Sequence, residues 1–276
     1  IVPRQNNAAY PANEHRQARL SVTADRMNYA SNIDDISKPD PQTTGDIDIV
    51  CPCYNPPEGF IQDLYRMIKV LRALYPGRRM RLIVANDGSA RGFGPEEQAE
   101  LLRSVSDTEI IDLPHRGKGA AIRAGIARST APVTIYTDID MPYTTESMRS
   151  VIDNVACGYD VVIAVRNSSY HSKLSLLRKL MSYGSKALNR IFLNIPYTDT
   201  QGGLKGLSPK ARKTMLRTRI DDFLFDTEFV VLSAREKGMK IKEIETTLRD
   251  GVVMSSMSGR VLVRELKNFF RIAFGL

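Results

Sequence analysis

The chain has 276 residues, 42% of them hydrophobic and 25% charged, which suits one large globular domain. Its formal net charge of +8 favours an anionic partner such as a phosphorylated substrate or an anionic lipid surface. Zinc-finger spacing and aromatic residues interleaved with Lys and Arg are absent, so we expect no nucleic acid partner. Three cysteines are too few for a disulfide framework, which favours a cytosolic compartment.

No run of about 18 apolar residues occurs, so we expect no membrane-spanning helix, and no segment has the pattern of a secretion signal. Residues 1–45 are polar, aperiodic and rich in proline, which predicts an N-terminal arm outside the core. The chain begins with Ile1 and ends among phenylalanines, so we expect an excerpt of a longer protein with a membrane segment beyond Leu276.

From residue 46 onward, strands alternate with helices. The hydrophobic patterns predict strands at 46–52, 80–85, 109–113, 133–137, 159–165 and 240–246, and helices at 58–75, 95–104, 120–128, 173–193, 209–217 and 225–237. Such alternation is typical of a doubly wound α/β fold, a mostly parallel sheet with helices on both faces.

Two carboxylates, Asp138 and Asp140, directly follow the β-branched strand at 133–137. Open α/β sheets bind ligands at the carboxyl ends of their strands, and like charges this close raise each other's pKa. A divalent cation relieves that repulsion, and oxygen-only ligands suit Mg²⁺ or Mn²⁺. The alternative is a solvated turn in which the aspartates only cap a helix.

Two further turns carry polar groups at the same predicted edge. Asp87 lies in an Asn-Asp-Gly-Ser turn, where the carboxylate either closes the turn or hydrogen-bonds a nucleoside. Arg116, Gly117, Lys118 and Gly119 join a strand to a helix and offer backbone N–H groups and two cations to phosphates. Their spacing is not that of a P-loop.

Six short motifs follow one another along the chain: Cys-Pro-Cys-Tyr-Asn at 51–55, Asn-Asp-Gly-Ser at 86–89, Arg-Gly-Lys-Gly at 116–119, Asp-Ile-Asp at 138–140, Asp-Thr-Gln-Gly-Gly at 199–203 and Phe-Asp-Thr-Glu at 225–228. In this order they resemble the family 2 glycosyltransferases of the GT-A fold, within the branch of dolichyl-phosphate β-glucosyltransferases and mannose synthases. The resemblance implies a single Rossmann-like GT-A domain at 46–250, followed by a basic amphipathic segment at 251–276.

The resemblance also implies roles for individual residues. The implied metal ligands are Asp138 and Asp140, and the implied catalytic residues are Asp140, Asp199, Lys205 and Asp226. Donor binding is implied for Pro52, Tyr54, Asn55, Asp87, Gly117, Lys118, Asp138 and Ile139. Binding of the acceptor phosphate is implied for Arg166, Arg178 and Ser182.

The resemblance implies an inverting, metal-dependent glycosyltransferase that moves a hexose from a nucleotide sugar to a polyprenyl or dolichyl phosphate. The preferred donor is UDP-glucose, and GDP-mannose is the next candidate. A phosphate acceptor is already a nucleophile and needs positioning by Arg, whereas a glycan or small hydroxyl acceptor needs a base, for which Asp226 is the candidate. A third hypothesis is a non-catalytic nucleotide-sugar-binding membrane module, which has no use for two metal carboxylates.

The C-terminal segment predicts a basic amphipathic helix. Its basic stripe consists of Arg260, Arg264, Lys267 and Arg271, and its apolar side of Leu262, Leu266, Phe269 and Ala273. Such a helix lies on an anionic membrane surface or packs on its own domain, and residues 173–190 have similar character. We therefore expect a peripheral protein at the cytosolic face of a membrane, with its oligomeric state left open.

Overall fold

The computed structural model describes residues 46–166, 193, 195–197, 199–249 and 259–274, without the side chains of 166, 259–264 and 266. The predicted arm at 1–45 lies outside the described residues, as do almost all of the predicted helix at 173–193, the two predicted acceptor residues Arg178 and Ser182, and the side chains of Arg260, Leu262, Arg264 and Leu266.

Strands and helices alternate along the described chain, as the hydrophobic pattern predicts. The strands are β1 (Ile47–Cys53), β2 (Met80–Asn86), β3 (Thr108–Asp112), β4 (Val133–Tyr136), β5 (Val161–Arg166), β6 (Lys205–Leu207) and β7 (Ile241–Thr246). The helices are α2 (Phe60–Leu74), α3 (Pro95–Ser104), α4 (Lys118–Arg128), α5 (Thr145–Ala156), α8 (Pro209–Met215), α9 (Phe225–Arg235) and α10 (Gly259–Phe274). The sequence patterns did not predict α5 or β6.

One seven-stranded sheet has the order β3-β2-β1-β4-β6-β5-β7. β1 pairs in parallel with both β2 and β4, whereas β6 runs antiparallel to its neighbours β4 and β5. The expectation of a mostly parallel sheet is confirmed. The strand order reverses direction between β1 and β4, and open α/β sheets bind their ligands outside the carboxyl ends of the strands at such a switch point.

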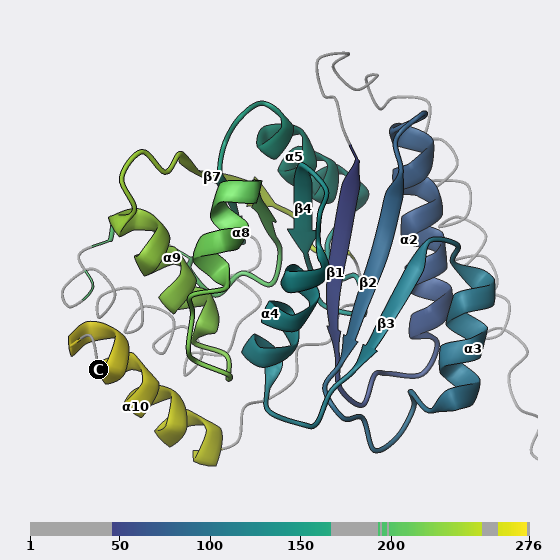
Figure 1. Ribbon diagram of the computed structural model, residues 1–276, viewed down its shortest axis with the longest axis horizontal. Helices are drawn as coiled ribbons and strands as arrows, with labels where there is room; N and C mark the ends of the chain where they lie inside the picture. Colours follow the sequence, from purple (N-terminus) through teal and green to yellow (C-terminus); the bar gives the residue numbers. More distant parts are fainter. Residues whose placement is uncertain (1–45, 167–192, 194, 198, 250–258, 275–276) are drawn as a thin grey trace, which may run out of the picture. The chain divides into compact units, whose positions relative to one another are not determined.

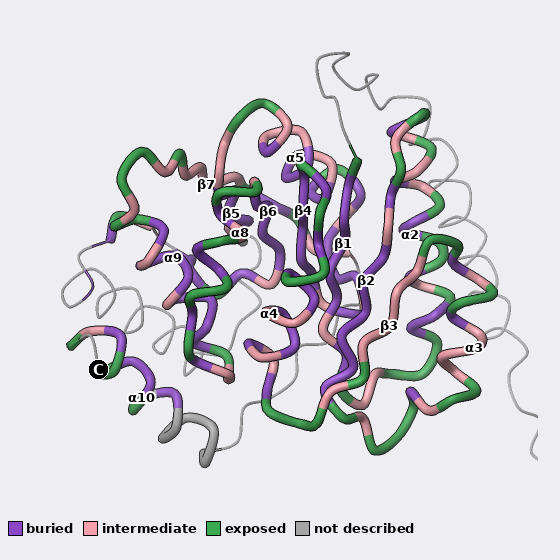
Figure 2. Tube along the Cα trace, viewed as in Figure 1, coloured by how far each residue is buried: buried purple, intermediate pink, exposed green. Residues whose placement is uncertain are grey.

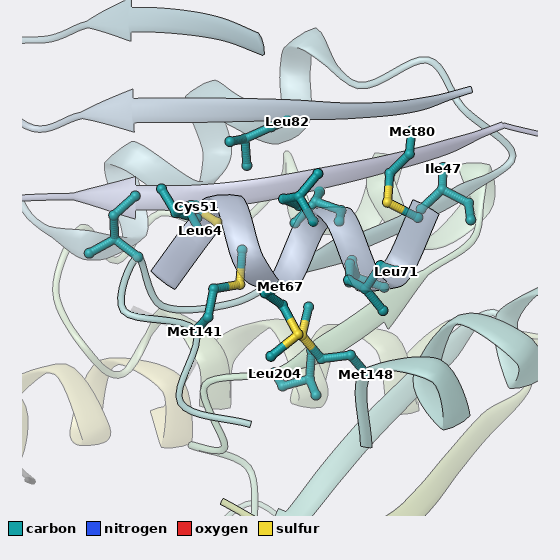
Figure 3. Close-up of a cluster of buried hydrophobic side chains, with 14 of the residues drawn as sticks. Ile47, Cys51, Leu64, Met67, Leu71, Met80, Leu82, Met141, Met148 and Leu204 are labelled. Atoms are coloured by element: carbon teal, nitrogen blue, oxygen red, sulfur yellow. The ribbon is translucent and has the colours of Figure 1, made fainter. Parts of the chain in front are cut away.

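Helices cover both faces of the sheet, so its central strands are buried on both sides (Figures 1 and 2). In β1, Ile47, Ile49 and Cys51 belong to a core cluster with α2, α3 and α5, while Val50 belongs to a second cluster with α4, α8 and α9. Figure 3 shows the first cluster, in which side chains of α2 meet those of the strands and of α5. This alternation is the period of two expected for a strand.

The helices α5 and α8 each begin after an N-cap residue with a hydroxyl side chain. The Thr144 side chain accepts a hydrogen bond from the backbone N–H of Ser147 at 3.3 Å, and the Ser208 side chain accepts one from Ala211 at 3.2 Å. Each hydroxyl satisfies a backbone N–H group that has no partner within its helix.

The C-terminal helix α10 packs on the second core cluster. Phe269 and Ile272 are buried there, and the Glu265 carboxylate accepts a hydrogen bond from the backbone N–H of Leu224 at 2.8 Å. Of the two predicted placements of this helix, packing on its own domain therefore holds for one face, while Lys267 and Arg271 of the predicted basic stripe are exposed. Among the described residues, no helix combines the length and the apolar character that crossing a membrane requires.

Asp48 of β1 is a buried carboxylate on which several segments converge. It accepts hydrogen bonds from the Arg81 guanidinium at 2.9 and 3.0 Å, from Ser129 Oγ at 2.8 Å, and from the backbone N–H groups of Thr130 and Ala131 at 2.8 and 3.0 Å. Burial raises the pKa of Asp48, but these hydrogen bonds outweigh burial, so that the pKa lies below its ordinary value.

Replacing Asp48 with Asn is expected to lower the free energy of unfolding at pH 7 by about 3 kcal/mol, because Arg81 loses its buried partner. The lowered pKa means that the carboxylate stabilises the fold above its unfolded pKa of about 3.9, and the difference between wild type and variant shrinks as the pH falls through the folded pKa. Urea unfolding at several pH values measures both effects.

Asp107→Asn is the matched control, because the Arg79–Asp107 pair at 3.0 Å is exposed, and its loss is expected to cost less than about 1 kcal/mol. Equal losses in the two variants would contradict the role assigned to Asp48.

Candidate active site

The polar turns singled out in the sequence lie at one edge of the sheet. Because β1, β2, β3 and β4 are parallel, the segments that follow them, 54–55, 87–89, 113–117 and 137–141, leave the sheet at the same end. The switch point between β1 and β4 brings Tyr54 and Asn55 to the same part of this edge as Asp138 and Asp140.

Asp87 is buried and holds the turn after β3. Its carboxylate accepts hydrogen bonds from the backbone N–H groups of Arg116 at 2.8 Å and Gly117 at 2.9 Å, and from Nδ1 of His115 at 2.8 Å. Asp87 thus joins the ends of β2 and β3, and its contact with the base of a nucleotide stays a prediction.

An exposed aromatic pair lies beside Asp87. The rings of Tyr54 and His115 stack with centroids 4.2 Å apart and an angle of 16° between their planes, and Tyr54 is 49% exposed. His115 was not among the predicted site residues, although it directly precedes the Arg-Gly-Lys-Gly motif. Asp87 fixes the orientation of the His115 ring through the hydrogen bond to Nδ1.

Asn55 and Pro52, two predicted donor-binding residues, shape the turn after β1. Asn55 has a φ of 46°, its side-chain oxygen accepts hydrogen bonds from the backbone N–H groups of Ala90 at 2.9 Å and Arg91 at 3.1 Å, and its own N–H donates to Ser89 Oγ at 3.0 Å. Pro52 lies within β1 itself. Their contact with a donor stays a prediction.

The two glycines of the Arg-Gly-Lys-Gly motif allow close contact with residues 220–222. A Cβ atom at Gly117 would lie 2.5 Å from the carbonyl oxygen of Asp221, and one at Gly119 would lie 2.5 Å from that of Ile220. The backbone N–H of Gly119 donates to the Asp221 carbonyl at 2.6 Å. Of the N–H groups that the motif could offer to a phosphate, those of Arg116, Gly117 and Gly119 therefore already have partners within the chain.

Lys118 carries the positive charge of this motif to the acidic pair. Its ammonium donates to the carboxylate of Asp138. Burial lowers the pKa of Lys118, but the negative charges around it, that of Asp138 above all, outweigh burial and raise the pKa above its ordinary value. Lys118 therefore stays charged beside the two aspartates.

Asp140 is the second member of the acidic pair. Burial and then the negative charge of Asp138 raise the pKa of its carboxyl group above its ordinary value. Arg249, which follows β7, donates to the backbone carbonyl of Asp140 at 2.6 Å and to the Asp63 carboxylate at 3.4 Å. Nothing in the local sequence around Arg249 indicated this contact, because it joins residues 109 positions apart.

The acidic pair fits a divalent cation. Two carboxylates that repel each other lose that repulsion on cation binding, and Mg²⁺ typically takes one or two carboxylates and completes its shell with water and phosphate. Within the described ranges, no cluster of three or more His, Cys, Asp or Glu residues forms a cage for a metal. Ile139, between the aspartates, is buried in the first core cluster.

A buried ion pair lies behind this edge. Lys205 is fully buried, and its ammonium donates to the Asp226 carboxylate and to the Gly202 carbonyl, both at 2.7 Å. The hydroxyl of Tyr136 donates to the same carboxylate oxygen of Asp226. Burial lowers the pKa of Lys205, although the charge of Asp226 opposes this shift.

The Gly-rich segment connects this ion pair to the acidic pair. A Cβ atom at Gly203 would lie 2.5 Å from a carboxylate oxygen of Asp138, so a side chain at this position would displace that carboxylate. Asp199 is buried, and its negative charge, like that of Asp226, opposes the lowering of the pKa of Lys205 that burial causes. The structure thus brings Asp199, Lys205 and Asp226 together, while their catalytic roles stay predictions.

The predicted acceptor residues are not all described. Arg166 ends β5, but its side chain, like all of Arg178 and Ser182, lies outside the described residues.

Glu228, in the acidic motif at 225–228, accepts hydrogen bonds from the backbone N–H groups of Arg219 at 2.9 Å and Ile220 at 2.9 Å. It therefore holds the loop that packs on Gly117 and Gly119.

Comparison with solved structures identifies the fold. Glucosyl-3-phosphoglycerate synthase from Mycobacterium tuberculosis, crystallised with Mn²⁺, UDP and glucosyl-3-phosphoglycerate, matches with a TM-score of 0.57 at 15% identity, over 85% of this chain and 82% of that one. Mannosyl-3-phosphoglycerate synthase from Rubrobacter xylanophilus matches with a TM-score of 0.58 at 14% identity, over 82% and 72% of the two chains. At these identities the likeness concerns the fold, which is the expected GT-A fold.

Sequence comparison places the family. The undecaprenyl-phosphate 4-deoxy-4-formamido-L-arabinose transferase of Pectobacterium carotovorum is 32% identical over 142 residues, which are 49% of this chain and 40% of that protein. The matched region thus spans less than half the length of this curated relative. Residues 48–215 match the model of the family described as glycosyl transferase family 2. Because that match covers more than half of the chain, the protein belongs to glycosyl transferase family 2.

Proposed function

We propose that this chain is an inverting, metal-dependent glycosyltransferase that moves a hexose from a nucleotide sugar to a polyprenyl phosphate. The observation that carries the proposal is the acidic pair Asp138 and Asp140, at the switch point of the sheet, with the charged Lys118 beside it. The name of the curated relative includes undecaprenyl phosphate, which supports a lipid-phosphate acceptor. A structural neighbour was crystallised with Mn²⁺ and UDP, which supports a nucleotide donor.

Asp138 and Asp140 would hold Mg²⁺ or Mn²⁺, which supplies positive charge to the leaving diphosphate when bound. Lys118 adds a second positive charge at the same place. The stacked rings of Tyr54 and His115 offer the base of the nucleotide an exposed aromatic surface, with Asp87 fixing the orientation of His115. Lys205 is a positioning residue. Its ammonium donates a hydrogen bond to the Gly202 carbonyl and so fixes the backbone at Gly203, which packs against Asp138.

For the donor we propose UDP-glucose first and GDP-mannose second. For the acceptor, Arg166 and Arg178 would hold the phosphate, which is a nucleophile at neutral pH and needs orientation rather than a base. The alternative with a hydroxyl acceptor requires Asp226 as base. Its carboxylate is buried and bound by Lys205 and Tyr136, which favours the phosphate acceptor.

We also propose that the protein is peripheral at the cytosolic face of a membrane. The support is the exposed side of α10, where Lys267 and Arg271 accompany Phe270 and Phe274. Cations and aromatic residues on one side of a helix suit the boundary between headgroups and acyl chains.

The test is a transfer assay with radiolabelled UDP-glucose or GDP-mannose, Mn²⁺ and a short polyprenyl phosphate, which follows labelled lipid. We expect labelled lipid with wild type and at least about a tenfold slower transfer with Arg178→Ala, because a charge-assisted contact contributes roughly 1.5–3 kcal/mol. UDP binding, measured by calorimetry, should be unchanged in Arg178→Ala.

Arg103→Ala, at an exposed position in α3, is the control for the loss of one cation and should transfer at the wild-type rate. A wild-type rate in Arg178→Ala, or label found only in a hydroxyl acceptor, would favour the alternative with Asp226 as base.

A further inference from the structure

A groove of about 510 Å³ lies between α9 and α10, helices that are neighbours in Figure 1. Its charged walls are Arg217, Arg219, Arg235 and Arg271, and its floor includes Val231 and Leu232. On α9 the groove follows the face of Glu228, Val231, Leu232 and Arg235, whereas Asp226 on the opposite face points to Lys205. The groove is therefore separate from the candidate active site.

The charge in this groove is only partly compensated. Glu228 uses its carboxylate to accept the backbone N–H groups of Arg219 and Ile220, and Arg217 donates to Glu236 at 2.6 Å. In the part of the chain that the structure describes, the guanidinium groups of Arg219, Arg235 and Arg271 have no ion-pair partner. Three guanidinium groups thus line the groove without an ion-pair partner among the described residues, and the guanidinium fork matches the oxygens of a phosphate.

The exposed side of α10 adjoins the groove and is aromatic. At about 100° per residue, Lys267, Phe274 and Phe270 lie about 40°, 60° and 100° from Arg271, all on the side away from the buried Ile272. Phe270 is 43% and Phe274 66% exposed, and their rings stack with centroids 6.1 Å apart and 7° between their planes. Apolar rings beside a cationic groove match the order of acyl chain and phosphate in a phospholipid.

We propose that the groove between α9 and α10 binds the phosphate of an anionic phospholipid, while Phe270 and Phe274 enter the acyl region. The proposal rests on the membrane association in the proposed function and names the ligand chemistry at that surface. It adds a phosphate site whose role is attachment and orientation rather than sugar transfer.

The test is flotation of the full chain on vesicles of phosphatidylcholine with and without phosphatidylglycerol. Arg219→Gln/Arg235→Gln is expected to weaken partitioning onto the anionic vesicles by about tenfold or more. The matched control Arg66→Gln/Arg103→Gln removes two exposed cations from α2 and α3 and should change partitioning much less. Phe270→Ser/Phe274→Ser should weaken binding as well, with the residual binding still dependent on phosphatidylglycerol.

Equal weakening in the two double-Arg variants would overturn the proposal, since diffuse charge would then explain the binding. Failure of the wild type to bind anionic vesicles would also overturn it, as would a change of oligomeric state confined to the groove variant. The same holds if the groove binds free inorganic phosphate in calorimetry but the groove variant floats as well as the wild type. Arg271→Gln alone, at an exposed position, repeats the test if the double variant unfolds.

Transfer to a detergent-solubilised acceptor distinguishes this proposal from the proposed function. The groove variants should keep it, because their side chains lie outside the candidate active site. If the wild type floats as expected but transfers no sugar, the proposed function fails and the groove proposal remains.

Discussion

Replacing Lys205 with Met is expected to lower the free energy of unfolding by about 3–5 kcal/mol, because it leaves the buried Asp226 carboxylate without its cation. Lys205 is fully buried, and the carboxylate keeps only the hydroxyl of Tyr136 as a partner among the contacts described here. The Gly202 carbonyl loses its donor in the same variant. Urea unfolding at pH 7, followed by circular dichroism, measures the loss.

Two variants control this experiment. Lys205→Met/Asp226→Leu removes both charges and should recover most of the stability, since an apolar pair of similar volume often replaces a buried ion pair at little cost. Arg217→Met breaks the exposed pair with Glu236 and should cost less than about 1 kcal/mol. If Lys205→Met costs as little as Arg217→Met, the ion pair does not organise this part of the core.

The second large effect is expected at the acidic pair. Asp140→Ala should weaken the Mn²⁺-dependent affinity for UDP by about a hundredfold. Loss of a group that only supports a metal ligand typically costs about 10–100-fold in affinity, and loss of a ligand itself should cost no less. Burial and then the negative charge of Asp138 raise the pKa of Asp140, and a cation bound by the two carboxylates would offset both effects. Calorimetry with UDP and Mn²⁺, repeated with EDTA, measures the effect.

Glu146→Gln is the matched control, because it removes an exposed carboxylate from the first turn of α5 and should leave UDP affinity unchanged. Asp140→Ala in Mn²⁺ and wild type in EDTA should then bind UDP about equally weakly. Equal affinity in wild type with Mn²⁺, wild type with EDTA and Asp140→Ala would remove the metal site from the proposal.

Much of the fold could be predicted from local patterns. The α3 helix has the predicted bounds, because Pro95 can open a helix but not continue one, and Glu97 accepts a hydrogen bond from the N–H of Gly94 at 2.8 Å. The strands β1, β2 and β4 are mostly apolar because both of their faces are buried.

Other elements had no clear local signal. β6 is only three residues long and begins with Lys205, a residue that usually faces solvent. It forms a strand because β4 and β5 offer it hydrogen bonds on both sides, and its charge is tolerated because Asp226, 21 residues further on, pairs with it. Neither condition is visible in a short window of sequence.

The sequence by itself determined which chemical groups this protein brings to the carboxyl edge of its sheet. Strand length and hydrophobic period place Asp87, Lys118, Asp138 and Asp140 at the ends of successive strands, and parallel strands end at one edge. Local pattern is enough for this, because the alternation of side chains along a strand and the turn residues that end it depend on near neighbours in the sequence.

Only the tertiary structure decided which of these groups are already paired. The contacts of Lys118 with Asp138, of Arg249 with the Asp140 carbonyl and of Asp221 with Gly119 join residues 20, 109 and 102 positions apart. The basic groove between α9 and α10 likewise depends on helix docking. Side chains distant in sequence meet only when burial of the core brings their elements together, and burial then decides which charges have a partner.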